Sequence, residues 1–311
     1  MPLARPTGLI DIHIHGQAGL DAMSADRKDL LRLSERLALG GVAGFLPTFI
    51  SSSKRELLRC IANARWAQGR EAGARILGVH LEGPFLNAGR KGTHNARHLR
   101  APDVAEAREW LAAGEGLVRL VTLAPELPGA GRLIRFLVER GVRVSLGHSR
   151  AGFAQAASAR AWGASSITHL FNAMEPLGHR QPGLAGFGLL DRQIYTELIA
   201  DGVHVHDAIV RLVLRTRPAD RMILVSDNFF LSGLARGSRH RYAGMDVKVE
   251  GDGSLRKADG TLAGSGLGLA DIVRRVQALG VLPAAAVAAM ARENPLRLLG
   301  LKAPSGRPGH G

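Results

Sequence analysis

The chain has 311 residues, 46% of them hydrophobic, with a mean hydropathy of +0.03, which is typical of a globular protein with a sizeable core. Its formal charge of +14 would suit a polyanion partner, but only six of its 41 basic residues are lysines and only 5% of its residues are aromatic. The arginines are spread over nearly every predicted helix, so we expect no nucleic-acid partner. The basic field favours a small anionic substrate.

The composition also bears on the compartment. The single cysteine, Cys60, lies in a helical pattern, so no disulfide framework is predicted. The opening residues 1–6 lack the apolar core of a signal peptide, and no apolar run approaches transmembrane length. We therefore expect a cytoplasmic protein without a membrane partner.

Apolar strand candidates alternate with amphipathic helical stretches along the chain. The strands are predicted at 8–15, 42–49, 75–82, 117–123, 142–148, 165–170, 194–200 and 221–227. The helices are predicted at 26–39, 53–70, 102–113, 131–140, 151–162 and 207–216, and helical periodicity returns at 268–280 and 284–300. This order predicts an α/β fold with a parallel sheet, and eight units in this length suit a closed (β/α)8 TIM barrel.

No repeat or clear linker divides this pattern, so residues 1–302 are predicted to form a single catalytic barrel. Two segments are longer than ordinary loops: a Gly- and Pro-rich insert at 171–191 and a second insert at 228–266. Within the second, alternation followed by a Gly-Asp-Gly turn predicts a hairpin at 245–253. Both inserts follow strand C-termini, the catalytic face of such barrels. Residues 303–311 are predicted to be a disordered tail.

Five of the predicted strands end in residues that can bind a metal or carry a proton. These residues are His13, His15, Glu82, His148, His169 and Asp227. One such strand end is most often structural, but five at the same end of one barrel indicate a catalytic site. Imidazole nitrogens and carboxylate oxygens suit zinc and related divalent ions. Asp227 is placed to take a proton from a water that such an ion activates.

The motifs around these residues resemble one family, the N-acetylglucosamine-6-phosphate deacetylases of the amidohydrolase superfamily. The resemblance runs from about Gly8 to Leu301, in the family's order. The motifs that carry it are His80–Asn87 (HLEGPFLN), Lys91–His94 (KGTH), Gly147–Ser149 (GHS), Thr168–Met174 (THLFNAM), Asp201–His204 (DGVH), Leu224–Asp227 (LVSD) and Leu262–Ser265 (LAGS).

The resemblance implies a ligand set for a divalent metal, expected to be zinc. Glu82, His148 and His169 match the ligands of the main ion. His13 and His15 match an H-x-H pair that completes a second site in some members of the superfamily. One or two ions are therefore expected.

The resemblance also implies roles around the substrate, N-acetylglucosamine 6-phosphate, which is hydrolysed to glucosamine 6-phosphate and acetate. Asp227 corresponds to the general base that later protonates the leaving amine, and His94 to the residue that contacts the substrate near its acetyl group. The residues that align with those holding the sugar phosphate are Asn172, Ala173 through its backbone, Arg180 and His204. A homodimer is also suggested.

Two features depart from the family. Its members usually carry a small β-sandwich formed by chain before the first strand and after the last helix. Here the first strand begins near the N-terminus and ten residues follow Leu301, so we expect that domain to be lacking. The family generally has alanine after the aspartate, where this chain has Asn228-Phe229-Phe230. Two alternatives stay open: an amidohydrolase for another N-acyl amino sugar or amide, and a non-catalytic basic binding protein with this fold.

Overall fold

Eight parallel strands form the centre of the fold in the computed structural model, which describes residues 8–242 and 245–302. In chain order they are β1 (Leu9–Ile14), β4 (Val42–Ile50), β6 (Val79–Glu82), β7 (Val118–Leu123), β8 (Arg143–Leu146), β9 (Ser166–Ile167), β10 (Tyr195–Leu198) and β11 (Met222–Leu224). Each strand pairs with the next, and the segment after β11 returns to β1 through a bridge between Ile14 and Asn228. The predicted TIM barrel is confirmed.

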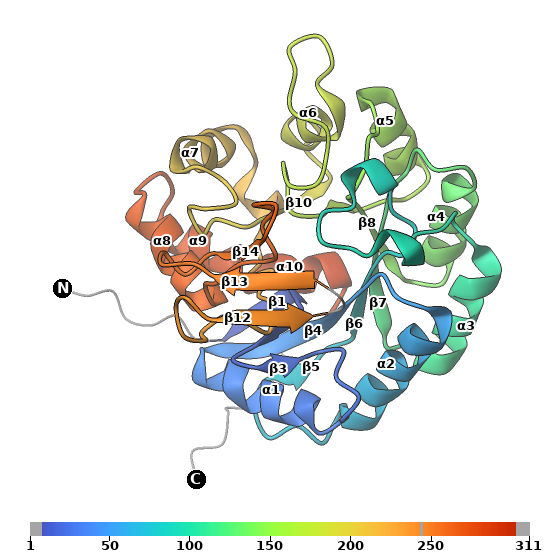
Figure 1. Cartoon of the computed structure of the whole chain (residues 1–311). Helices are drawn as coiled ribbons and strands as arrows, with labels where there is room; N and C mark the ends of the chain where they lie inside the picture. The colour runs from blue at the N-terminus through green and yellow to red at the C-terminus, as the bar shows by residue number, and fades with distance from the viewer. Residues whose placement is uncertain (1–7, 243–244, 303–311) are drawn as a thin grey trace.

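A helix follows each strand and lies outside the ring of strands (Figure 1). These helices are α1 (Asp29–Leu39), α2 (Lys54–Ala67), α3 (Val104–Gly114), α4 (Ala130–Glu139), α5 (Phe153–Ala161), α6 (Gly183–Leu190), α7 (Asp207–Thr216) and α8 (Leu269–Ala278). The main apolar core lies between strands and helices and includes the fully buried Phe45, Phe49 and Trp110. Burial of this layer is the principal favourable contribution to folding.

One helix falls where the sequence pattern indicated only an insert. Helix α6 occupies 183–190 of the expected loop 171–191, and six of its eight residues are buried. Its glycines conceal it in the sequence because glycine is a poor helix former in isolation. A Cβ on Gly188 would lie 2.7 Å from Cδ1 of Ile167 in β9, so a larger residue there would force the isoleucine side chain to shift.

The predicted helix at 284–300 is in fact two helices, α9 (Ala284–Ala289) and α10 (Glu293–Leu299). The break precedes Pro295, which has no N–H to donate to the carbonyl of Ala291. That carbonyl instead accepts a hydrogen bond from Ile10 N at 2.8 Å. Leucines of α10 then pack with Ile10, Ile12 and Ile223 in a second core cluster, so α10 contributes to the apolar interior of the barrel.

The insert at 228–266 forms an antiparallel sheet of three strands, β12 (Arg239–Tyr242), β13 (Met245–Val249) and β14 (Leu255–Lys257). The predicted hairpin is confirmed as β13–β14, whereas β12 was missed because its sequence, Arg-His-Arg-Tyr, does not alternate. The insert has its own core, which includes Phe229, Leu231 and Val247.

The remaining elements are short. They are β2 (Gly16–Gln17), β3 (Leu20–Asp21), β5 (Arg75–Ile76), which splits from the predicted strand 75–82, and the 3-10 turns η1 (Ala88–Arg90), η2 (Ala96–His98) and η3 (Ala219–Arg221). The predicted tail at 303–311 lies outside the described residues. Within the described part of the chain, no helix combines the length and apolar character needed to span a bilayer.

Candidate active site

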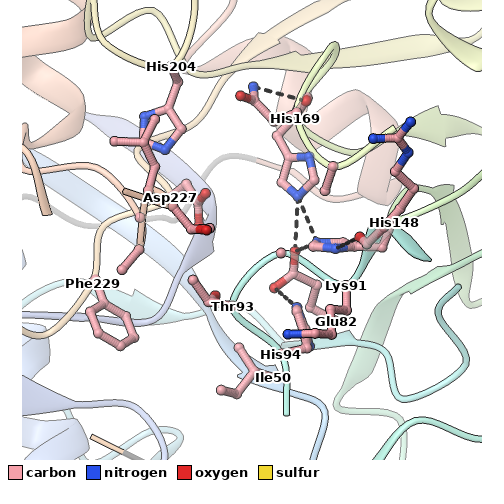
Figure 2. Close-up of a pocket in the computed structure, with 18 of the residues that line it drawn as sticks. Ile50, Glu82, Lys91, Thr93, His94, His148, His169, His204, Asp227 and Phe229 are labelled. Atoms are coloured by element: carbon pink, nitrogen blue, oxygen red, sulfur yellow. Dashed lines mark hydrogen bonds and ion pairs between the residues drawn. The ribbon is translucent and has the colours of Figure 1, made fainter. Parts of the chain in front are cut away.

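Glu82, at the end of β6, is the centre of a cluster of histidines at the mouth of the barrel (Figure 2). Its Oε1 lies 3.0 Å from Nε2 of His148 and 3.1 Å from Nε2 of His169. Nε2 of His13 lies 3.4 Å from the same oxygen, and Nε2 of His15 lies 3.4 Å from Oε2. Strand ends far apart in the sequence thus direct four imidazoles at one buried carboxylate.

Hydrogen bonds to main-chain carbonyls fix the tautomers of two of these rings. Nδ1 of His148 lies 2.9 Å from the carbonyl oxygen of Arg90, and Nδ1 of His15 lies 3.1 Å from that of Thr48. A carbonyl oxygen only accepts, so Nδ1 carries the hydrogen in both rings. In its neutral form, each ring therefore turns an Nε2 lone pair towards Glu82, as a metal ligand must.

His13 is oriented in the same way by Glu197, a residue that the sequence analysis missed. Nδ1 of His13 lies 3.0 Å from Oε2 of Glu197, and both side chains are fully buried. Nε2 of His13 has no hydrogen-bond partner among the described residues, which is the condition expected of a ligand atom. The signal for Glu197 was an acidic residue in the interior of a predicted strand.

Two overlapping groups of side chains could each hold a divalent ion. One group is Glu82, His148 and His169, and the other is His13, His15 and Glu82; within each, the donor atoms lie within 4.8 Å of one another. Nitrogen and oxygen donors in sets of three match a catalytic site that keeps a position open. Although burial disfavours the charged form, His13, His94 and His148 hold the pKa of Glu82 well below its usual value. The residues present fit one ion or two.

Asp227 lies beside this cluster, with its Oδ1 3.1 Å from Nε2 of His15 and 3.5 Å from Nε2 of His13. Burial raises its pKa, but the two histidines lower it by more, so the pKa of Asp227 lies below its usual value. An ionised carboxylate that lines the pocket can accept a proton from a bound water.

Three residues of the cluster have left-handed backbones where their strands end. The φ angles are 49° for His148, 29° for His169 and 46° for Asp227. Such conformations cost about 1–3 kcal/mol each in non-glycine residues and concentrate at functional sites. The conformation turns each side chain sharply at the barrel mouth.

His94 is held in the opposite tautomer. Its Nδ1 accepts a hydrogen bond from the backbone N–H of Ser51 at 3.1 Å, so this nitrogen carries no hydrogen in the neutral ring. The hydrogen is therefore on Nε2, which lies 3.2 Å from Oε2 of Glu82. His94 is thus a hydrogen-bond donor into the site rather than a metal ligand, which suits its predicted contact with the acetyl group.

The cluster opens into a pocket of about 610 Å³. Asn172, Ala173 and His204 line it, and Nδ1 of His204 is held 2.8 Å from Oδ2 of Asp201. Arg180 is exposed and is not among the described residues that line the pocket. Its assignment to the sugar phosphate therefore stays a prediction from the family pattern.

The fold and this ligand set are those of a known family. Residues 7–307 match the model of the amidohydrolase family. The chain belongs to this family. The family is metal-dependent, in agreement with the two groups of potential ligands.

The relatives of this amidohydrolase include a Bacillus subtilis N-acetylglucosamine-6-phosphate deacetylase, 37% identical over 94% of this chain and 75% of that protein. An Escherichia coli O157:H7 N-acetylgalactosamine-6-phosphate deacetylase is 39% identical over 94% of this chain and 77% of that protein. A Mycobacterium smegmatis N-acetyl-D-glucosamine-6-phosphate deacetylase has been solved as an aspartate-to-alanine mutant in complex with N-acetyl-D-glucosamine-6-phosphate. It has a TM-score of 0.89 and 36% identity, over 96% of this chain and 78% of that one.

Proposed function

We propose that this amidohydrolase removes the acetyl group of N-acetylglucosamine 6-phosphate, producing glucosamine 6-phosphate and acetate. The observation that carries the proposal is the convergence of Glu82 and four histidines beside the ionised Asp227 at the barrel mouth. The named activities of the relatives identify the chemistry as deacetylation of an amino sugar phosphate. The ligand geometry disfavours a non-catalytic binding protein, because such a protein would give no reason for titratable side chains from five strand ends to converge.

Glu82, His148 and His169 would hold the main ion, for which we propose zinc, and His13 and His15 are available for a second. When bound, such an ion polarises the amide carbonyl and lowers the pKa of a water. Nitrogen and carboxylate donors with an open position are the ligand pattern of catalytic zinc.

The residues of the chain then divide the reaction between them. Asp227 takes a proton from the attacking water as its oxygen bonds to the carbonyl carbon. Nε2–H of His94 donates a hydrogen bond to the oxygen that becomes negative in the tetrahedral intermediate. Asp227 next gives its proton to the amide nitrogen, the carbon–nitrogen bond breaks, and acetate and the free amine leave.

The sugar phosphate is assigned to the part of the pocket lined by Asn172, Ala173 and His204. Lys91 and Arg256 also line the pocket and add positive charge that favours a dianionic substrate. The cytoplasmic location and the homodimer stay predictions from the sequence.

The direct test is acetate release by protein of measured metal content. We expect kcat/KM for N-acetylglucosamine 6-phosphate to exceed that for unphosphorylated N-acetylglucosamine by about 100-fold, because charge-assisted hydrogen bonds to phosphate are lost with the phosphate. N-acetylgalactosamine 6-phosphate is assayed beside it, since one relative is named for that epimer. No acetate from either phosphorylated sugar, at full metal content, would contradict the proposal.

Replacing His94 with glutamine should lower kcat by about 100- to 1000-fold, the range for loss of one oxyanion donor. The metal content should not change, because Nε2 of His94 carries a hydrogen and is no ligand. Elemental analysis beside steady-state kinetics checks both statements. The matched control is His98→Gln in the exposed turn η2, which should behave as the unchanged protein. A loss of metal in the His94 variant would show that this ring ligates an ion after all.

A further inference from the structure

The pocket of this enzyme has chemically different ends. Figure 2 shows His204 above Asp227, whereas Phe229, Thr93 and Ile50 are drawn below it. All five side chains line the same cavity. The end near His204 is polar and is assigned to the sugar phosphate, so the other end, with an aromatic ring and an aliphatic side chain, needs a different occupant.

The apolar end is formed by side chains that the surrounding structure holds closely. Phe229 is only 5% exposed and Ile50 9% exposed, although both line the pocket. The ring of Phe229 packs edge-on against that of His15, with an interplanar angle of 72° and centroids 6.5 Å apart. Ile50 ends β4 and immediately precedes Ser51, which fixes the tautomer of His94.

Phe229 is also anchored from behind by the insert. It belongs to the insert's core with Leu231 and Val247. Gly264, with φ of 88°, approaches so closely that a Cβ there would lie 3.0 Å from Cβ of Phe229 and 2.9 Å from the carbonyl oxygen of Asp227. The ring therefore has little room to move away from a larger ligand.

The reaction determines which group meets this wall. The carbonyl carbon of the substrate carries three substituents: the oxygen, the nitrogen that leads to the sugar, and the methyl carbon of the acetyl group. The oxygen is directed at His94, and the nitrogen must be within reach of Asp227 with the sugar phosphate beyond it near His204. The methyl carbon points in the remaining direction, away from the sugar.

We propose that Phe229 and Ile50 form the acyl pocket of this enzyme and restrict its substrates to the acetyl group. This inference rests on the proposed deacetylase function and adds the residues that select the acyl chain. An apolar group larger than methyl would meet a ring that has little room to move, and one additional methylene in an apolar pocket typically changes kcat/KM by about 10- to 200-fold.

The test compares N-acetyl-, N-propionyl- and N-butyrylglucosamine 6-phosphate, with kcat/KM measured for each. The unchanged enzyme should lose at least about 10-fold from acetyl to propionyl. The Phe229→Ala variant should raise the butyryl-to-acetyl ratio of kcat/KM by at least about 10-fold, and Ile50→Ala should raise it in the same direction.

Several controls distinguish an effect of pocket size from an effect of impaired folding. Phe230→Ala changes the neighbouring phenylalanine, which is not among the described residues lining the pocket, and should leave the ratio unchanged. Phe229→Leu keeps more of the insert's core packed if the alanine variant folds poorly. Ile50→Val changes a residue of β4, outside the insert. Binding of the same three ligands to variants that also carry Asp227→Asn supplies a readout without turnover.

The outcomes distinguish failure of the proposed function from failure of the acyl pocket. Absence of acetate release by the unchanged enzyme contradicts the proposed function and the acyl pocket together. Acetate release with an unchanged chain-length ratio in the folded Phe229 and Ile50 variants contradicts the acyl pocket alone. An unchanged enzyme that accepts butyryl as well as acetyl also overturns it.

Discussion

Replacing Asp227 with asparagine is expected to lower kcat about 1000-fold while the ion at Glu82, His148 and His169 stays bound. Asparagine has nearly the same shape but cannot accept the proton of the attacking water or deliver one to the leaving amine. General acid–base catalysis contributes about 100- to 10,000-fold, and we propose that Asp227 performs both transfers. The asparagine side chain can still lie beside Nε2 of His15, which Asp227 approaches to 3.1 Å.

The measurement pairs steady-state acetate release with elemental analysis on the same sample. Asp220→Asn is a matched control, because that aspartate lies in the turn η3 before β11 and its side chain is 60% exposed. It should retain normal kcat and metal content. Near-normal turnover of the Asp227 variant would reject its assignment as the base.

Replacing Glu82 with glutamine should remove bound metal and abolish detectable turnover. Glu82 is the one residue common to both potential metal groups, and its two oxygens face different histidines. Glutamine offers a neutral oxygen in place of a charged ligand, and even partners one step removed from a metal contribute 10- to 100-fold to its affinity. We expect the affinity for metal to fall by more than about 100-fold.

Metal titration of the dialysed variant measures this effect, with Glu139→Gln as the control. Glu139 ends α4, and its side chain is 71% exposed, so its loss should leave metal affinity unchanged. If the Glu82 variant bound metal as tightly as the unchanged enzyme, the site would lie elsewhere.

The sequence predicted the barrel well because each buried strand is a short apolar run between amphipathic helices. Helix α6 could not be predicted in the same way. The glycines that weaken its propensity pack closely against β9 and Pro182, in contacts that exist only after the chain has folded. The break at Pro295 was visible in the sequence, but the partner of the freed carbonyl, Ile10, lies almost the whole chain away.

The clustering of Glu82, His148, His169, His13, His15 and Asp227 was similarly predictable from their positions at strand ends. The residues that orient them were not, since Glu197 meets His13 across 184 positions and Ser51 meets His94 across 43. No local pattern encodes such pairs. Arg180 shows the converse limit, because a family motif assigns it to the sugar phosphate, whereas in this chain it is exposed and is not among the described residues that line the pocket.

Phe229 belongs both to the pocket wall and to the core of the insert, which bears on how the substrate range of this enzyme can change. Its ring is part of the pocket wall, yet much of its support comes from the insert at 228–266 rather than from the barrel. The proposed metal ligands, in contrast, all project from barrel strand ends. Part of the proposed acyl preference is therefore carried by a segment separate from these strand ends, whereas Ile50 and the residues assigned to the sugar phosphate belong to the barrel. Exchange of the insert would alter one wall of the acyl pocket while the strand ends stay in place.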